Sequence, residues 1–277
     1  MKARNKSLSA VMLLALTILV SGCNMFEAID SSVNTSSASD LINEGNDRLA
    51  EADYSAALNR FDRALEKTDS DSARRGRASA YAGLAGFNMF SALNSMQNDL
   101  AAPNTSAAIF QAAKKINSLE NIDKAIDDMA LLSNPTKEDL LFRSILASLS
   151  AAKTIVEKYD TNLNSKLDKP DQINFTTNDK KTKSWEQLYS RFGSSGSPYS
   201  LEKAYIELTK AFDGRGDSWK TISPFASTTS SGKYTQANYN TIEAVGDFGQ
   251  RIKAANIIYG NSESEFKTAI LALDGVD

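Results

Sequence analysis

The chain has 277 residues, of which 42% are hydrophobic and 23% charged, and its formal net charge is −3. This composition supports a folded core and is neither disordered nor collagen-like. The sequence contains no histidine and one cysteine, Cys23. These counts exclude Ser-His-Asp and Cys-His nucleophile systems, imidazole metal sites and intramolecular disulfides.

The first 22 residues have the pattern of a secretory signal. An apolar stretch covers residues 8–20, small residues follow it, and the chain opens with three basic side chains, Lys2, Arg4 and Lys6. A basic start, a short apolar centre and small residues before a cleavage point are typical of such signals. The apolar stretch is short for a membrane-spanning helix. Residues 1–22 are therefore predicted to be removed, and the alternative of a plain signal peptide with a chance cysteine stays open.

The end of this signal, Val20-Ser21-Gly22-Cys23, resembles the lipobox of bacterial lipoproteins. The resemblance implies that Cys23 is acylated and becomes the mature N-terminus, anchored by several acyl chains such as palmitate. It also implies a cell-envelope location. Asn24 after the cysteine favours the outer membrane, facing the periplasm, by the sorting pattern of that family.

The charge of the mature chain argues against nucleic acid as a partner. Cleavage before Cys23 removes three of the 31 basic residues and none of the 34 acidic ones, so the net charge becomes −6. Phosphate binding needs a clustered excess of Lys and Arg. The short clusters 74–77 and 180–183 are interpreted as solvated charge.

A serine-rich segment, residues 23–38, is predicted to be a flexible tether. After it, residues 39–277 are predicted to form one all-α domain of antiparallel helical hairpins, with an irregular polar loop near 160–184. Ser39 is a candidate N-cap for the first helix. Later helices are expected at 137–159, 201–212 and 242–258, and at 263–273 after a cap at Ser262. A further helix rich in small residues is expected over 73–98.

One apolar stripe of helical period lies on residues 54–65 and carries a specific resemblance. A small residue on the preceding helix, then alanines and aromatics at fixed spacing, is similar to one tetratricopeptide repeat; the residues are Gly45, Tyr54, Ala57, Phe61 and Ala64. The resemblance implies that these side chains pack the two helices of a hairpin. It predicts a right-handed solenoid of two or three degenerate repeats, or a compact helical array. An ordinary helical hairpin is the alternative.

Residues 160–171 have the oxygen spacing of an EF-hand-like calcium loop. The five candidate ligands at loop positions 1, 3, 5, 9 and 12 are Asp160, Asn162, Asn164, Asp168 and Asp171. Three departures count against the match: Ser165 replaces the central glycine, an aspartate replaces the final glutamate, and Pro170 stiffens the exit. The two interpretations are a weak calcium site and a polar connecting loop.

The sequence favours a binding protein over an enzyme. It has no glycine-rich phosphate loop or nucleophile elbow, and Asp127 and Asp128 are expected on a solvated helix face. No cofactor is expected apart from the weak calcium. The leading hypothesis is a membrane-anchored scaffold that binds an envelope protein or peptide in an assembly, secretion or transport complex. The alternative is a periplasmic small-molecule-binding component of a transporter, with an apolar pocket lined by Tyr81, Phe87, Phe90, Phe110 and Phe142.

Overall fold

The computed structural model describes residues 37–87, 105–164, 166–171, 183–213, 236–260 and 262–274. Within these ranges the regular secondary structure is helical and contains no strand, so the all-α prediction is confirmed. In that described part of the chain, no helix combines the length and apolar character needed to cross a bilayer. The helices are α2 (Ala38–Ala50), α3 (Tyr54–Lys67), α4 (Asp71–Leu84), α6 (Thr105–Ala113), α7 (Leu119–Ala130), α8 (Lys137–Tyr159), α10 (Ser184–Phe192), α11 (Leu201–Asp213), α12 (Gln236–Ile258) and α13 (Glu263–Leu273).

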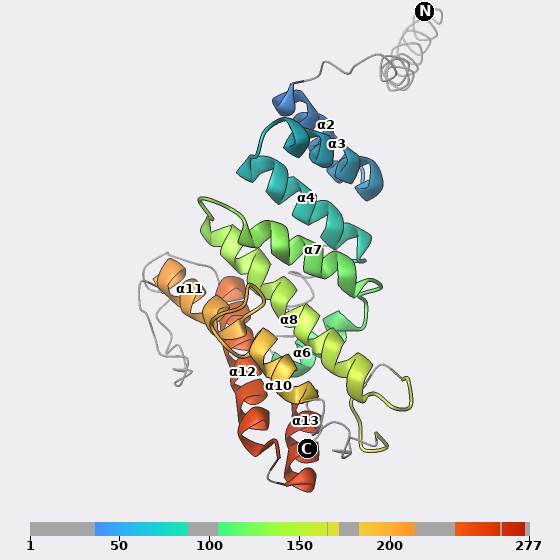
Figure 1. The fold of residues 1–277 in the computed structure, drawn as a ribbon, viewed down its shortest axis with the longest axis vertical. Helices are drawn as coiled ribbons and strands as arrows, with labels where there is room; N and C mark the ends of the chain where they lie inside the picture. Colours follow the sequence, from blue (N-terminus) through green and yellow to red (C-terminus); the bar gives the residue numbers. More distant parts are fainter. Residues whose placement is uncertain are drawn as a thin grey trace, which may run out of the picture.

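The helices form an elongated body with α2 at one end and α13 at the other (Figure 1). In the first half, α2 packs on α3, α3 on α4, α4 on α7 and α7 on α8, whereas α6, which lies between α4 and α7 in the sequence, packs on α8 and α12. The α2 helix also reaches α4 directly. Between α4 and α7, the ammonium group of Lys124 lies over the ring of Tyr81, 5.6 Å from its centroid. This half is therefore a stack of successive helices.

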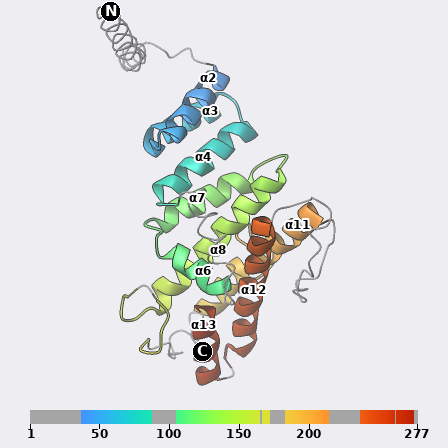
Figure 2. The same cartoon turned by 180° about the vertical axis from the view of Figure 1, so that it is seen from behind.

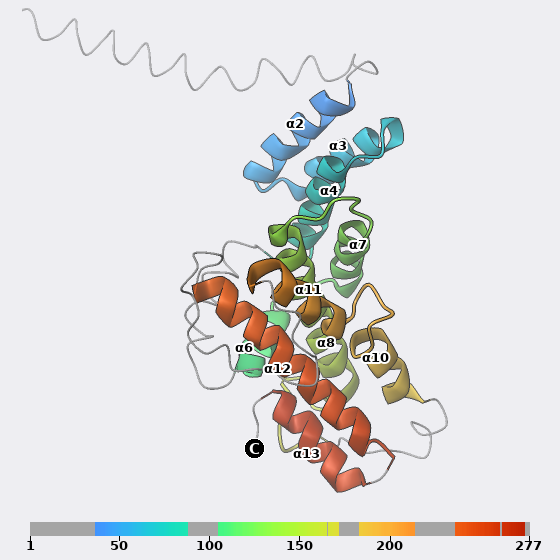
Figure 3. The same cartoon turned by 90° about the vertical axis from the view of Figure 1, so that its left-hand side faces the viewer.

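The second half is organised around α8, the most deeply buried helix. Residues 141–152 of α8 are all buried, because this helix contacts α6, α7, α10, α11 and α12. Seen from behind, α6 and α12 cover α8 (Figure 2), and a quarter turn shows α12 and α13 packed along each other (Figure 3). α8 is therefore the central helix of the second half, against which the other helices pack.

An aromatic cluster closes the end of the body beyond α8. The indole of Trp185 on α10 lies 6.3 Å from the ring of Tyr159 and 5.1 Å from the ring of Phe266 on α13. Tyr259, which follows α12, lies 5.8 Å from Phe266. The pair of Trp185 and Phe266 packs edge to face, which adds to the stabilisation from buried area. The cluster therefore connects α8, α10 and the α12–α13 pair.

Two predicted helices have the expected bounds, whereas the predicted cap of the first helix is wrong. The helices at 137–159 and 263–273 have the predicted ends, and Ser262 caps the latter. The first cap is Ser37 instead of Ser39, because Ser37 and the Asp40 carboxylate form a reciprocal capping box with hydrogen bonds of 3.2 and 3.0 Å. Cys23 and most of the predicted tether lie outside the described residues, whereas Ser37 caps α2 and Ala38 is its first residue.

The helix expected over 73–98 ends at Leu84, and residues 88–98 of that prediction lie outside the described part of the chain. Gly86 adopts a φ of +82°, a left-handed conformation that favours glycine and ends the helix. The carbonyl of Ala85 then accepts a hydrogen bond of 3.0 Å from the backbone N–H of Asn117. A long-range contact therefore fixes this turn.

Candidate functional site

Three of the five predicted repeat-packing residues, with Gly76, meet at one contact between α2, α3 and α4. The ring of Phe61 is fully buried in a cluster with Ala57. A Cβ atom built on Gly45 of α2 would lie 2.7 Å from this ring, and one built on Gly76 of α4 would lie closer still. Since real Cβ atoms do not approach so closely, both glycines are required by the contact. One aromatic ring thus fills the space between two neighbouring helices.

The other two predicted packing residues lie on either side of this contact. Ala64 is buried with Leu41 and Ala73, and the half-buried ring of Tyr54 lies against Gly83 of α4. Sequence reasoning missed the roles of Gly76 and Gly83. The usable signal was that a glycine inside a helical pattern costs about 1 kcal/mol relative to alanine, and therefore often marks a close approach.

The basic cluster at 74–77 is not solvated charge, which corrects the sequence interpretation. The Arg77 guanidinium donates to both carboxylate oxygens of Asp128, at 2.7 and 2.5 Å, and to Asp62 at 3.0 Å. The side chain of Asp128 is only 4% exposed. The hydrogen bond to Asp128 raises the pKa of Arg77 above its usual range.

Arg74, with its side chain 15% exposed, lies 3.6 Å from Asp128 and donates to Asp69 at 2.8 Å. The cluster therefore joins α4 to α7 instead of offering a charged surface.

A second arginine links α4 to the start of α8. Arg75 donates from Nε to both oxygens of Asp139, at 3.0 and 2.9 Å, and from Nη2 to the carbonyl of Asn134 at 3.1 Å. The same Asp139 belongs to the capping box with Thr136 that begins α8. One carboxylate thus serves both the helix start and the contact between helices.

The loop before α8 is held by the first residue of α4. The Asp71 carboxylate accepts hydrogen bonds from the backbone N–H groups of Ser133, at 2.9 Å, and Asn134, at 3.0 Å. These two hydrogen bonds lower the pKa of Asp71 below 3.8. A carboxylate with a depressed pKa contributes stability that is present above its unfolded-state pKa and is lost as the pH falls through the folded-state pKa.

Asp71→Asn is accordingly expected to lower the melting temperature slightly at neutral pH. The difference from the unmodified chain should shrink as the pH falls through the lowered pKa of Asp71, below which both proteins carry a neutral side chain at position 71. Thermal unfolding followed by circular dichroism between pH 7 and pH 3 measures this difference. A pH-independent difference would show that the carboxylate charge is not what holds the loop.

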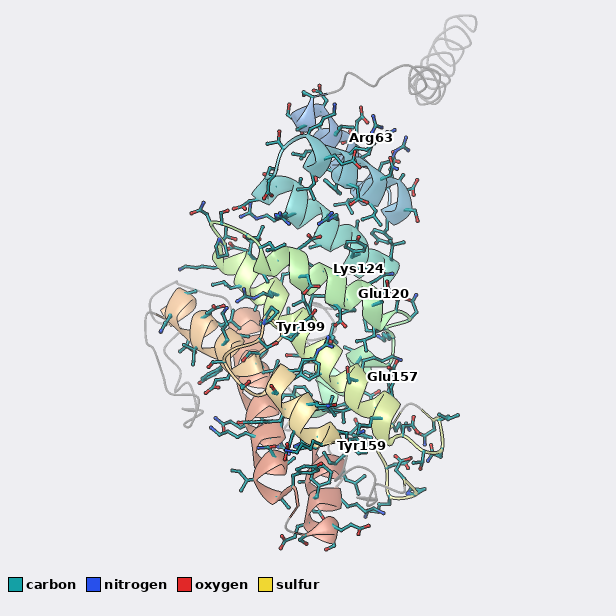
Figure 4. All side chains as sticks on the ribbon, viewed as in Figure 1. Arg63, Glu120, Lys124, Glu157, Tyr159 and Tyr199 are labelled. Carbon is teal, nitrogen blue, oxygen red and sulfur yellow. The ribbon has the colours of Figure 1, made fainter. Side chains whose placement is uncertain are left out.

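A third contact joins α10 and its following loop to α7. The Tyr199 hydroxyl donates to Asp127 Oδ1 at 2.7 Å, midway along the body (Figure 4). The Arg191 guanidinium carbon lies 4.1 Å from the Tyr199 ring centroid, and its Nη2 lies 2.7 Å from Asp123 Oδ2. Burial, followed by the hydrogen bond to Asp127, raises the pKa of Tyr199. Asp127 is therefore exposed, as expected, although it has a partner, whereas the buried Asp128 corrects the expectation of a solvated pair.

A cavity of about 560 Å³ opens beside this contact. It lies along α10 and the loop that leads to α11, and both the polar ends and the apolar stems of its side chains line it. The lining residues are Lys183, Glu186, Gln187, Ser190, Arg191, Ser197 and Tyr199. The sequence did not indicate this site. Its residues are close together in the sequence, but the side chains of Arg191 and Tyr199 are held by Asp123 and Asp127 of the distant helix α7.

The predicted calcium loop is described except for Ser165, and it is organised around Asp171. This carboxylate is fully buried. It accepts hydrogen bonds from the backbone N–H groups of Thr161 and Asp168, both at 2.9 Å, and from the Thr161 hydroxyl at 3.2 Å. A carboxylate that accepts such hydrogen bonds from its own loop stabilises the closed conformation of the loop.

The remaining candidate ligands also contact each other. Asp168 accepts from the side-chain amides of Asn162, at 3.2 Å, and Asn164, at 2.7 Å, and the backbone N–H of Asn164 donates to Asp160 at 3.2 Å. Among the described residues, no group of three or more acidic or cysteine side chains is arranged to hold a metal ion. The loop is anchored from outside by Asp274, which accepts from the backbone N–H of Leu167 at 2.8 Å. Calcium binding stays a prediction.

If the loop does bind calcium, millimolar calcium should raise the melting temperature by about 2–4 °C. Asp160→Ala should abolish that rise, because it removes the first ligand. Asp69→Ala, which changes an exposed carboxylate elsewhere, should leave the rise intact. Thermal scans with and without calcium test this, and either no rise in the unmodified chain or an unchanged rise in Asp160→Ala would rule the site out.

Three of the five aromatic residues proposed to line an apolar pocket, Phe87, Phe110 and Phe142, lie in the core. Phe87 and Phe142 are stacked with centroids 6.4 Å apart, and Phe110 meets Phe248 edge to face at 5.5 Å. All four of these rings are buried. Tyr81 is half-buried beside Lys124, and Phe90 lies outside the described residues.

No protein-family model, no curated protein and no solved structure matches this sequence.

Proposed function

We propose that the chain is a lipid-anchored lipoprotein of the bacterial cell envelope whose tetratricopeptide-like helices bind a protein or peptide partner. The observation that carries the proposal is the Phe61 ring lodged between Gly45 and Gly76. In repeat proteins, small residues against an aromatic ring let neighbouring helices stack closely, and the stacked helices present an extended binding surface.

The sequence supplies the anchor in this proposal. The lipobox-like Ser21-Gly22-Cys23 would attach the N-terminal side of the chain to the membrane, with Asn24 favouring the outer membrane. The described body is elongated, with α2 and α13 at opposite ends (Figure 1). An anchor before α2 would leave most of this length free to meet a partner in the periplasm.

A binding role is favoured over catalysis because the carboxylates that sequence analysis considered for acid–base chemistry have structural partners. Asp128 is paired with Arg77, and Asp127 accepts the Tyr199 hydroxyl. The alternative of a small-molecule receptor with an apolar pocket is less favoured, since Phe87, Phe110 and Phe142 pack against other core residues.

The test is co-purification of the intact lipoprotein from detergent-solubilised envelopes, with crosslinking and mass spectrometry. We expect a reproducible stoichiometric partner, and crosslinks that fall on α2, α3, α4 or α7. Recovery of the lipoprotein alone would contradict the scaffold proposal and favour the receptor.

Two variants separate the anchor from the scaffold. Cys23→Ser should fail to incorporate labelled palmitate, whereas Ser31→Ala in the same segment should incorporate it. Gly76→Ala should weaken partner capture without changing membrane attachment. Incorporation of palmitate into Cys23→Ser would refute lipidation at Cys23 while leaving the partner question open to the co-purification.

A further inference from the structure

The two sides of α4 belong to different parts of the hydrophobic core. On the side toward α2 and α3, Ala73 and Ala80 are buried in two small clusters with residues of those helices. On the other side, Ala78 and Ala82 belong to the large cluster that α4 shares with α6, α7, α8 and the later helices. The described core is therefore divided at α4, and the hairpin formed by α2 and α3 lies on its smaller side.

This hairpin is attached to the body through α4. The principal helix contacts of α2 and α3 are with each other and with α4, at one end of the body (Figure 1). The buried hydrophobic side chains of the two helices are Leu41, Ala57, Phe61 and Ala64. Hydrophobic stabilisation grows with buried apolar area, and alanine contributes little of it. Leu41 and Phe61 therefore supply most of the apolar stabilisation on this side of α4.

The charged contacts of α4 are also stronger on the side of α7. Arg77 donates to the buried Asp128 of α7 at 2.7 and 2.5 Å, and to Asp62 of α3 at 3.0 Å. The Asp62 side chain is 43% exposed, and Asp69, which Arg74 contacts in the turn after α3, is exposed as well. Exposed ion pairs contribute little to stability. α4 is therefore held more firmly by α7 than by the hairpin.

We propose that α2 and α3 open as one unit, which detaches from α4 while α4, α7 and α8 stay packed. Parts of a protein with few buried apolar contacts open cooperatively at a lower free energy than the whole fold. The opening separates Phe61 from Gly76 and breaks the contact of Arg77 with Asp62, but it retains the contact of Arg77 with Asp128. With an anchor before α2, opening would lengthen the link between membrane and body, and only this consequence rests on the proposed function.

Hydrogen exchange of the detergent-solubilised full chain, followed by mass spectrometry, measures the opening. We expect the amides of α2 and α3 to share one protection factor, at least about tenfold below that of α7 and α8, and those of α4 to resemble α7. Equal protection of α2, α3 and α8 would overturn the proposal. A protection factor that falls gradually toward Ala38 would also overturn it, because such a gradient indicates fraying of a chain end instead of a cooperative unit.

Two core substitutions distinguish separate opening from global unfolding. Ile155 of α8 is buried in the large cluster, and its contacts persist when the hairpin opens. Ile155→Val should therefore lower the protection factor of α7 and α8 roughly two- to tenfold and leave that of α2 and α3 unchanged. An equal loss in α2 and α3 would show that the hairpin opens only when the whole chain unfolds, which would overturn the proposal.

Phe61→Leu is the matched change inside the hairpin. It should lower the protection factor of α2 and α3 roughly fivefold or more, because the contact of the ring is lost on opening. The protection factor of α8 should fall by the same factor, since global unfolding breaks this contact too. Unchanged protection of α2 and α3 in this variant would contradict the opening, because their amides would then exchange with the ring still in place.

Discussion

Asp128→Asn is expected to destabilise the fold by about 3 kcal/mol, toward the lower end of the range for removing one partner of a buried ion pair. The Asp128 side chain is 4% exposed and accepts two hydrogen bonds from Arg77, at 2.7 and 2.5 Å. The variant leaves Arg77 and the nearby Arg74 in a mostly buried position without their shared countercharge. Both arginines retain a second carboxylate, Asp62 or Asp69, which limits the loss.

The preceding residue on the same helix provides a matched control for this prediction. Asp127 is exposed and accepts one hydrogen bond, from the Tyr199 hydroxyl at 2.7 Å. Asp127→Asn should therefore cost about 1 kcal/mol or less. Urea unfolding of the two variants at neutral pH gives both free energies. Equal losses in the two variants would show that the Arg77–Asp128 contact does not stabilise the stack of α4 on α7.

The comparison of these two aspartates also shows what the sequence could not predict. Adjacent helix positions are separated by about 100° around the axis, so Asp127 and Asp128 face different surroundings. The sequence places both on a polar helix face. It does not reveal that an arginine 51 positions earlier lies opposite one of them. The ion pair is a property of how α4 and α7 pack.

Local signals were sufficient where helix ends are set by their own residues. The start of α13 was predicted from its N-cap, Ser262, and α8 likewise begins after a local cap, Thr136. The prediction of a helix over 73–98 was wrong, because the sequence does not show which of Gly76, Gly83 and Gly86 ends the helix. Only Gly86 turns the chain, and the distant Asn117 fixes that turn.

The candidate sites also differ in whether they depend on local or on distant residues. The packing of Phe61 against Gly45 was predictable because both residues belong to one hairpin with a recognisable spacing. The cavity beside α10 was not predictable, because Arg191 is oriented by Asp123, which lies 68 positions earlier in the chain. Sites built from one local motif are visible in a sequence, whereas sites that need two distant elements require the structure.

Gly76→Ala is expected to destabilise the fold by about 2 kcal/mol, although helix propensity alone predicts the opposite sign. Alanine is about 1 kcal/mol more favourable than glycine inside a helix. The added Cβ atom would overlap the Phe61 ring, which is fully buried and already confined by Gly45 on its other side. Overpacking of this kind costs about 1–3 kcal/mol. Ser72→Ala, at an exposed position of α4, should change stability by no more than about 0.5 kcal/mol.

A double-mutant cycle with Phe61→Leu separates the steric contact from other effects of Gly76→Ala. A smaller side chain at position 61 removes the overlap, so Gly76→Ala should be neutral or stabilising in the Phe61→Leu background. The two substitutions should show a favourable coupling of at least about 1 kcal/mol, as expected for residues in direct contact. Additive effects would mean that the ring does not lie between α2 and α4. That result would also remove the main support for a tetratricopeptide-like stack, because the proposed binding surface depends on the close approach of these helices.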